Sequence, residues 1–328
     1  MKLYLLITGP KVWAGKATPV FFVVLAFLLG SAIGAGAETS SSLLSPLASS
    51  ALLLDAVSKD GRICAVGERG HVLLSLDDGR NWRQVQVPTR ETLTGLTLLD
   101  NRLGWVVGHD AVILRTRDDG EHWEKVYDAP DDDRPLFDVW FQNERRGFAI
   151  GAYGLCLRTL DGGDSWQPVI VSEEEEWHLY HMASSTNGHL YIAAESGQIY
   201  RSDDNGDSWI TLPSPYDGSF FGVLPLEGDV VLIFGLRGHV FRSEDAGTNW
   251  QRLSTGTVAT LADGVKLTDG RILLAGLAGT VLVGKEQNSG FAAIPGPGRR
   301  GIWAVIETEE GGLICFGEGG ATRLALEK

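Results

Sequence analysis

One eight-residue pattern, Ser/Thr-x-Asp-x-Gly-x-x-Trp, occurs five times in this chain at nearly constant spacing. Its aspartates follow one another at intervals of 41, 43, 43 and 41 residues. A fixed period of about 40 residues indicates one supersecondary unit copied along the chain, which constrains the fold before any strand is assigned. The aspartate and tryptophan of the five copies are Asp77 and Trp82, Asp118 and Trp123, Asp161 and Trp166, Asp204 and Trp209, and Asp245 and Trp250.

The same period continues beyond the five copies. A pair of small residues three positions apart precedes each copy, beginning with Gly67 and Gly70, and two further pairs follow the last copy. The final pair is Gly317 and Gly320, and the sixth unit keeps Phe291 where the earlier units have tryptophan. We therefore expect seven units, of which the last two lack the eight-residue pattern.

Each unit contains four short apolar runs bounded by glycine, aspartate or asparagine, which is the pattern of strands joined by turns. In the third unit we expect strand a at residues 135–142, strand b at 146–150, strand c at 155–159 and strand d at 166–171. Four-stranded units arranged around an axis form a β-propeller. The sequence therefore predicts an all-β, seven-bladed β-propeller over residues 38–328, with almost no helix.

The seventh unit ends before a fourth strand can form. Residues 301–326 supply strands a, b and c only, and the segment 40–47 stands just before strand a of the first unit. We expect this N-terminal segment to supply the missing outer strand and to close the ring. Such a closure would cover two sheet edges that otherwise invite aggregation.

The eight-residue copies resemble the Asp-box, or BNR-type, repeats of β-propellers. In such a turn the serine or threonine hydroxyl and the aspartate carboxylate accept backbone N–H groups, and the tryptophan packs beside the turn. The copies lack the spaced acidic ligands and the terminal glutamate of a calcium loop. We therefore expect them to be structural and to bind no metal.

The first 37 residues have the layout of a secretory signal peptide. Three lysines precede an apolar run that begins at Pro19, and small residues ending in Ala35-Gly36-Ala37 form an A-x-A cleavage site. This pattern predicts export to a periplasm, or to a thylakoid lumen if the source is photosynthetic. Residues 19–37 are also about long enough to span a bilayer, so an uncleaved membrane anchor is the alternative.

The chain is acidic, with a formal net charge of −14 at pH 7, and removal of the three signal-peptide lysines would make it −17. Such a charge argues against nucleic acid as a partner. The three cysteines, an odd number, do not form a disulfide framework. Cys64 and Cys315 fall in strand b of neighbouring blades, about 10 Å apart, whereas a disulfide needs Cα atoms within about 7 Å. We expect these two and Cys156 to be buried free thiols.

Asp boxes also occur in sialidases, so a sialidase-like glycoside hydrolase is the enzymatic alternative. Sialidases share an Arg-Ile-Pro segment, for which the nearest match here is Arg62-Ile63-Cys64 inside a predicted strand. Acids such as Asp110 and Glu195 could form a hydrolytic carboxylate pair. The sequence shows no metal-ligand spacing, phosphate loop or serine nucleophile elbow. We therefore expect no enzyme activity, no cofactor and no small-molecule substrate.

The stretch from Ala65 to Trp82, AVGERGHVLLSLDDGRNW, resembles the photosystem II stability/assembly factor family. Members are exported seven-bladed propellers that hold a reaction-centre precursor in the thylakoid lumen. The resemblance, over residues 50–328, implies a non-catalytic scaffold whose partner is a membrane-protein complex or its precursor subunit. Related sequences in heterotrophic bacteria imply instead a periplasmic role, such as that of an accessory protein beside an envelope exporter.

A partner-binding surface is expected on the rim where the b–c turns and the d–a loops of a propeller meet. Aromatic residues and arginines are the types that dominate interface hot spots, and both gather in these segments. The residues that we expect to form this surface are Arg69, His109, Asp110, Arg134, Tyr153, Trp177, Arg237, Arg299 and Arg300.

Overall fold

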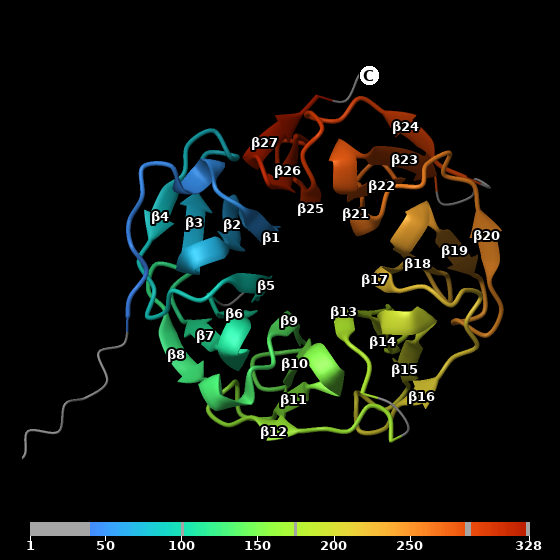
Figure 1. Cartoon of the computed structure of the whole chain (residues 1–328), viewed down its shortest axis with the longest axis horizontal. Coiled ribbons are helices and arrows are strands. Elements are labelled where there is room, and N and C mark those ends of the chain that lie inside the picture. Colours follow the sequence, from blue (N-terminus) through green and yellow to red (C-terminus); the bar gives the residue numbers. More distant parts are fainter. Residues whose placement is uncertain (1–39, 100–101, 174–175, 286–289, 326–328) are drawn as a thin grey trace, which may run out of the picture. The chain divides into compact units, whose positions relative to one another are not determined.

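The structure is a computed structural model that describes residues 40–99, 102–173, 176–285 and 290–325. Residues 39–328 are one compact unit, and its strands form seven antiparallel sheets around an axis (Figure 1). The prediction of an all-β, seven-bladed propeller is therefore confirmed. The predicted signal peptide, residues 1–37, lies outside the described residues. No helix in the described part of the chain is long and apolar enough to span a membrane.

The first three blades follow the predicted order, with strand a nearest the axis and strand d outermost (Figure 1). Blade 1 consists of β1 (Leu53–Lys59), β2 (Arg62–Gly67), β3 (His71–Ser75) and β4 (Arg83–Val85). Blade 2 consists of β5 (Leu93–Leu98), β6 (Gly104–Gly108), β7 (Ile113–Thr116) and β8 (Glu124–Tyr127). Blade 3 consists of β9 (Leu136–Phe141), β10 (Gly147–Gly151), β11 (Cys156–Thr159) and β12 (Gln167–Pro168).

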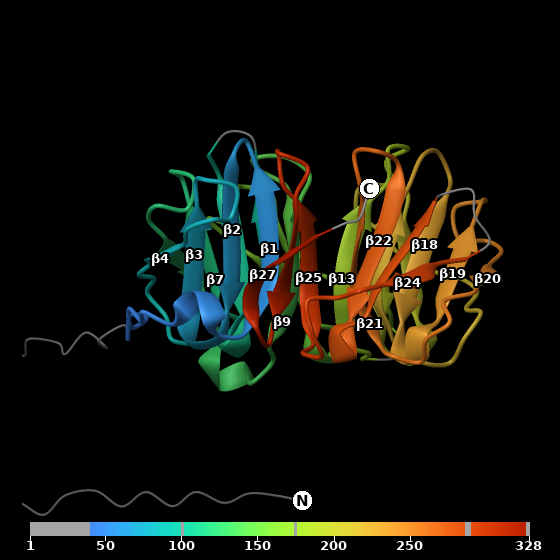
Figure 2. The ribbon, with the colours of Figure 1, turned by 90° about the horizontal axis from the view of Figure 1, so that it is seen from above.

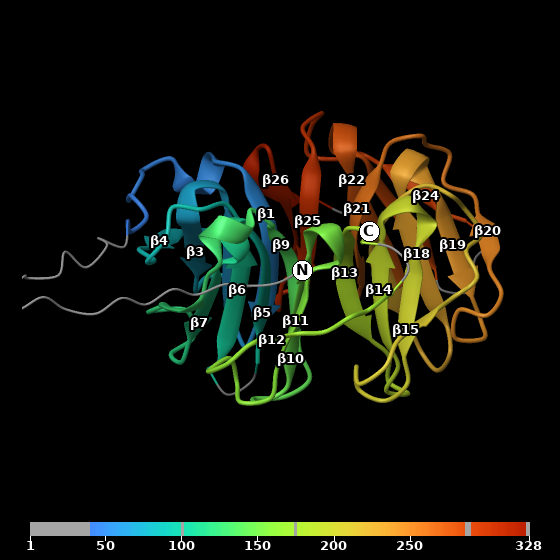
Figure 3. The same ribbon diagram turned by 60° about the horizontal axis from the view of Figure 1, so that its bottom comes forward.

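Blades 4 to 6 repeat this order and blade 7 has strands a, b and c, and the inner strands stand side by side around the axis (Figure 3). Blade 4 consists of β13 (Leu179–Ser184), β14 (Leu190–Ala194), β15 (Ile199–Ser202) and β16 (Ile210–Thr211). Blade 5 consists of β17 (Phe220–Pro225), β18 (Val231–Gly235), β19 (Val240–Ser243) and β20 (Gln251–Leu253). Blade 6 consists of β21 (Leu261–Lys266), β22 (Arg271–Gly276), β23 (Val281–Lys285) and β24 (Ala292–Ile294), and blade 7 of β25 (Ile302–Glu307), β26 (Leu313–Gly317) and β27 (Gly320–Leu324).

The helical segments of the described residues are 3-10 turns of three residues each. In six blades such a turn joins strands b and c, and its central residue has a positive φ between 51° and 58°. These turns are η2 (Glu68–Gly70), η3 (His109–Ala111), η5 (Ala152–Gly154), η6 (Glu195–Gly197), η7 (Leu236–Gly238) and η8 (Leu277–Gly279). The other two are η1 (Ala48–Ser50), before blade 1, and η4 (Pro130–Asp132), between blades 2 and 3.

Seven apolar clusters fill the seven interfaces between adjacent blades. Each box tryptophan belongs to the cluster between its own blade and the preceding blade. Trp166 of blade 3, for example, meets Phe141 edge-on with ring centroids 5.9 Å apart, and Phe141 stacks on Trp105 of blade 2. In blade 6, Phe291 takes this place, as the sequence predicts.

The five boxes have one geometry, represented by the copy in blade 3. The Thr159 hydroxyl accepts the Gly163 N–H at 2.8 Å and donates to Asp161 at 2.8 Å. The Asp161 carboxylate also accepts the N–H of Ser165 at 2.9 Å and its hydroxyl at 2.6 Å. The oxygens of the box therefore serve the turn itself, which supports the structural interpretation of the boxes.

The ring does not close as the sequence predicts. Among the described residues blade 7 has three strands, and the segment 40–47 adds none to it. That segment instead runs beside blade 1, where the buried Ser42 exchanges hydrogen bonds with Val87 and the Gln84 side chain bonds the Leu43 carbonyl (Figure 1). The prediction was wrong because hydrogen bonds with strand d of blade 1 and with the residues just after it hold the segment there.

Side chains rather than a shared strand join blade 7 to blade 1. Phe316 of β26 is 1% exposed and meets Trp82 of blade 1 edge-on at 5.8 Å. Arg323 of β27 donates to the carbonyl and to the carboxylate of Asp78, at 2.6 and 2.9 Å. Ring closure therefore depends on one apolar cluster, bordered by polar contacts to the first box turn.

The three cysteines are free and buried, as predicted. Burial raises the pKa of the thiol in Cys156 and in Cys315 to about 12, and raises that of Cys64 further. A thiol with so high a pKa is a poor nucleophile, because the thiolate is the reactive form. These side chains are therefore part of the core.

Replacement of Phe316 by alanine should lower the free energy of unfolding by about 3–5 kcal/mol, because it leaves a cavity at the closure between blades 7 and 1. Phe316→Leu, which keeps most of the volume, should cost less than about 1.5 kcal/mol. Urea unfolding followed by tryptophan fluorescence measures both. Equal costs for the two variants would contradict the closure described here.

The box geometry predicts the effect of removing one hydroxyl. Thr159→Val keeps the shape of the side chain but leaves the buried Gly163 N–H without an acceptor, which should cost about 1–3 kcal/mol of stability. Thr159→Ser introduces the residue found in three other boxes and keeps the hydroxyl, so its stability should stay close to that of the original protein. Chemical denaturation compares the two variants, and a serine variant as unstable as the valine variant would contradict this role.

The boxes also predict that the stability of the fold depends on pH. Hydrogen bonds from Ser165 lower the pKa of Asp161 to about 2, and Asn249 does the same for Asp245. A carboxyl whose pKa is lower in the folded state than its usual value near 3.9 stabilises the fold above that value, and this stabilisation is lost as pH falls toward 2. Thermal unfolding between pH 5 and pH 2 should show this loss, and a variant carrying both Asp161→Asn and Asp245→Asn should show less of it.

Candidate functional site

The b–c turns and the d–a loops lie on one rim of the propeller, which we call the b–c/d–a rim. The backbone N–H of the first residue of each b–c turn donates to the carbonyl of the residue just before strand a of the same blade. Glu68 donates in this way to Leu52, and Glu195 to His178. Figure 2 shows the 3-10 turns gathered along this rim. The structure therefore confirms that the two sets of segments predicted to meet do so.

The nine residues predicted for the binding surface all lie on this rim, but they spread over the ring. Arg69, Asp110, Tyr153 and Arg237 are the central, left-handed residues of their b–c turns. Most of the predicted side chains are exposed, Arg69 to 81% and Tyr153 to 55%. Arg299 and Arg300 are also exposed, in the connection from blade 6 to blade 7.

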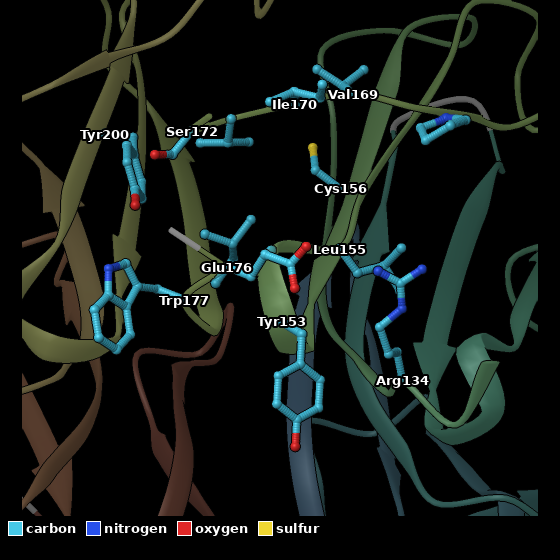
Figure 4. Close-up of a pocket in the computed structure, with 14 residues that line it drawn as sticks. Arg134, Tyr153, Leu155, Cys156, Val169, Ile170, Ser172, Glu176, Trp177 and Tyr200 are labelled. Carbon is cyan, nitrogen blue, oxygen red and sulfur yellow. The ribbon is translucent and has the colours of Figure 1, made fainter. Parts of the chain in front are cut away.

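Three of the predicted residues, Arg134, Tyr153 and Trp177, line one pocket between blades 3 and 4. The pocket has a volume of about 190 Å³. Figure 4 shows Glu176 between Trp177 on one side and Arg134 on the other. Ile170, which is 72% exposed, adds an apolar edge. The pocket thus combines aromatic and aliphatic surface with one cation and one carboxylate.

The turn around Tyr153 is held in place by His178. The Tyr153 N–H donates to Nδ1 of His178 at 3.0 Å, and the two rings meet edge-on at 4.6 Å. The His178 N–H in turn donates to the Glu195 carboxylate. These contacts fix Tyr153 although more than half of it faces solvent, and a fixed aromatic side chain loses little entropy when it binds a partner.

Arg134 is not a free cation in this pocket, because it is paired with a carboxylate of its own loop. Arg134 makes two hydrogen bonds to Asp132, at 2.7 and 2.6 Å. This contact raises the pKa of Arg134, and Glu176 adds to the effect. Part of the arginine charge is therefore already balanced, and any carboxylate that binds there must compete with Asp132.

The acids considered for hydrolysis are not arranged as a catalytic pair. Asp110 is in the b–c turn of blade 2 and Glu195 in that of blade 4, two blades away. The Glu195 carboxylate accepts a backbone N–H at the entry to strand a, and Glu68 and Glu318 do the same in blades 1 and 7. Glu195 therefore has a structural role that recurs around the ring.

Sequence reasoning missed a second feature of the same rim, the wall of the central channel. Every inner strand has a β-bulge at its second residue. In four blades that residue is aromatic: Phe137, Tyr180, Phe221 and Trp303. In the sequence, each of these aromatic residues directly follows the apolar residue that begins strand a. Alternation of apolar and polar residues does not reveal a β-bulge, so the sequence could not show that these side chains face the channel.

Three aspartates, Asp55, Asp138 and Asp263, follow the bulges in blades 1, 3 and 6. Each accepts an N–H from its own strand and another from the inner strand of the next blade. The inter-blade bonds come from Leu96 to Asp55, from Met182 to Asp138 and from Val305 to Asp263, at 2.6, 2.7 and 2.7 Å. These carboxylates therefore brace neighbouring blades at the channel.

The described residues contain no group of three or more histidine, cysteine, aspartate or glutamate side chains placed to hold a metal ion. The Asp-box acids are occupied by their own turns, as the blade 3 copy shows.

The fold and the box repeats define this protein as a seven-bladed Asp-box β-propeller. The family model described as "Photosynthesis system II assembly factor YCF48" matches residues 74–136 and 129–289. The chain belongs to this family, which confirms the resemblance seen in the sequence. The homologues in this family are assembly factors rather than enzymes.

Individual relatives and solved structures are also similar to this chain. The photosystem II assembly protein Ycf48 of Thermosynechococcus vestitus is 38% identical over 47 residues, which is 14% of each chain. A solved structure described as YCF48 bound to D1 peptide has a TM-score of 0.70 at 17% identity, covering 88% of this chain and 97% of that one. YCF48 from Cyanidioschyzon merolae has a TM-score of 0.68 at 13% identity, covering 86% and 97%. At these identities the structures show a shared fold.

Proposed function

We propose that this protein is an exported, non-catalytic scaffold that holds an extended segment of a membrane-protein precursor on its b–c/d–a rim. Family membership supports a role in the assembly or stability of a membrane-protein complex. The solved YCF48 that carries a D1 peptide supports a precursor segment as the partner. The single observation that carries the proposal for this chain is the pocket that brings Arg134, Tyr153 and Trp177 together on the predicted rim.

The chemistry of the rim suits an extended peptide. The pocket between blades 3 and 4 offers a fixed Tyr153 ring and the exposed Ile170 for an apolar side chain. Arg237, Arg299 and Arg300 project from other blades of the same rim and can contact carboxylates further along the peptide. In a protein with a net charge of −14, these arginines are the groups that would attract an acidic segment.

Export is part of the proposal and rests on the sequence of residues 1–37. A lysine-containing start, an apolar run and an A-x-A site direct a chain across a membrane, which would place the propeller in a periplasm or a lumen. In a photosynthetic source the partner would be a photosystem II precursor subunit. In a heterotrophic bacterium it would be a subunit of another envelope complex.

The rim arginines provide the test. Replacing Arg69, Arg237, Arg299 and Arg300 together by alanine should leave the fold intact, since exposed substitutions usually change stability by at most about 0.5 kcal/mol each. Affinity for the partner should fall at least about fivefold, the effect of losing one contact worth about 1 kcal/mol. The probes are a fluorescent copy of the D1 peptide, followed by anisotropy, and a pull-down from envelope membranes of the source organism.

A second quadruple variant, on the opposite rim, controls for net charge. Arg80, Arg83, Arg102 and Arg117 lie at or beside the box turns and their side chains are 52–63% exposed. Their replacement by alanine removes the same charge and should leave binding unchanged. Equal loss in both variants would show that the effect is general electrostatics, and no loss in the first would show that these four arginines do not contact the partner.

A further inference from the structure

The mouth of the central channel contains a cavity that is separate from the pocket between blades 3 and 4. It has a volume of about 490 Å³, and every residue that lines it belongs to one of the seven inner strands. The bulge at the second residue of each strand places that residue at the entrance from the b–c/d–a rim. Any ligand in this cavity would contact several blades at once.

Aromatic rings form a large part of the cavity wall. Phe137 stacks on Tyr180 with centroids 5.6 Å apart, and Tyr180 meets Phe221 at 4.8 Å. Trp303, from blade 7, is 36% exposed and lines the same cavity. Rings from four blades therefore present their surfaces to one space that has access to solvent.

Carboxylates lie one residue further along the strands, at Asp55, Asp138 and Asp263. Each is fixed by two backbone N–H groups, one to each oxygen, at 2.6–2.7 Å. These bonds orient the carboxylates, and no lysine or arginine among the residues that line the cavity balances their negative charge. His181 is the one basic side chain of the lining, with Nε2 4.0 Å from Asp138.

The three carboxylates also act on one another. Burial raises the pKa of Asp55 well above its usual value, and the charges of Asp138 and Asp263 raise it further. Burial likewise raises the pKa of Asp263. Like charges held near one another repel, and a cation placed among them would relieve this repulsion.

We propose that the channel mouth binds one organic cation, an alkylammonium or guanidinium group, with its charge facing the three aspartates and its carbon atoms against the aromatic rings. A cation over an aromatic face is attracted by the ring quadrupole, and the N–H groups of an organic cation can bond the remaining lone pairs of the carboxylates. A bare metal ion fits less well, because the described residues contain no group of three or more histidine, cysteine, aspartate or glutamate side chains placed to hold one.

Two sources could supply such a group. One is a lysine or arginine side chain of a bound partner segment, which would fix that segment over the centre of the ring. The other is a free amine. The inference stands apart from the proposed function, because a free amine can fill the cavity without any partner and the cavity shares no lining residue with the pocket between blades 3 and 4.

The first experiment compares n-butylammonium with n-butanol, which has the same carbon chain and no charge. Calorimetric titration of the full propeller at pH 8, a pH that favours ionised carboxylates, should show saturable binding of the cation and none of the alcohol. Equal binding of both compounds would overturn the proposal. The absence of cation binding up to about 50 mM would also overturn it, because a ligand with a Kd of about 1 mM would saturate the site at that concentration.

The second experiment locates the site with a matched pair of variants. Trp303→Leu removes the aromatic face and should weaken cation binding about three- to tenfold, the loss of one cation–π contact, whereas Trp303→Phe should keep most of the affinity. Trp303 is partly exposed, so both variants should fold. Unchanged affinity in Trp303→Leu would overturn the proposed location.

The third experiment identifies the source and tests the carboxylates. A capped Gly-Lys-Gly peptide that binds at least tenfold more tightly than butylammonium, with a capped Gly-norleucine-Gly peptide as the inactive control, would assign the site to a partner side chain. Equal affinity would assign it to free amines. Asp138→Asn should lower the affinity for butylammonium and for the lysine peptide. If that variant does not fold, the contrast between butylammonium and butanol decides whether charge is required.

Discussion

Each blade is a thin antiparallel sheet that can bury its two faces only against its neighbours, so the whole structure depends on the packing between blades. Seven apolar clusters provide this packing, one for each interface. The Asp box makes the arrangement repeatable, because its turn satisfies its own N–H groups and directs a tryptophan into the interface with the preceding blade. Where the box is lost in blade 6, Phe291 still fills the interface.

The same dependence explains how the inner channel became a candidate site. An inner strand must contact its own blade and also approach the inner strands on either side. The bulge at its second residue turns one side chain toward the channel, and the aspartate that follows in three blades bonds the next blade. The aspartates that join the blades and the aromatic residues at the bulges therefore surround one cavity. Side chains that stabilise the fold can also contact a ligand there.

The sequence predicted most of the architecture and part of the rim. The period of the boxes fixed the number of blades, and the turn pattern fixed which residues occupy the b–c turns, including Arg69, Asp110, Tyr153 and Arg237. It could not show that Arg134 is paired with Asp132 or that Glu195 caps the entry to strand a, because both contacts depend on how loops fold back on the sheet. It also placed the segment 40–47 on the wrong blade, since a short run of serines and leucines has no periodic pattern that selects one blade edge over another.

What the sequence alone determined is therefore the repeated unit: its four strands, its box turn, the tryptophan that joins it to the preceding unit, and the family to which the chain belongs. These follow from local chemistry that recurs every 41–43 residues. Only the tertiary structure decided which distant side chains meet. The closure between Phe316 and Trp82, the pocket of Tyr153 and Trp177, and the channel of aromatic rings and aspartates all join residues from different blades or loops. Such contacts arise from the geometry of the closed ring, which no single repeat contains.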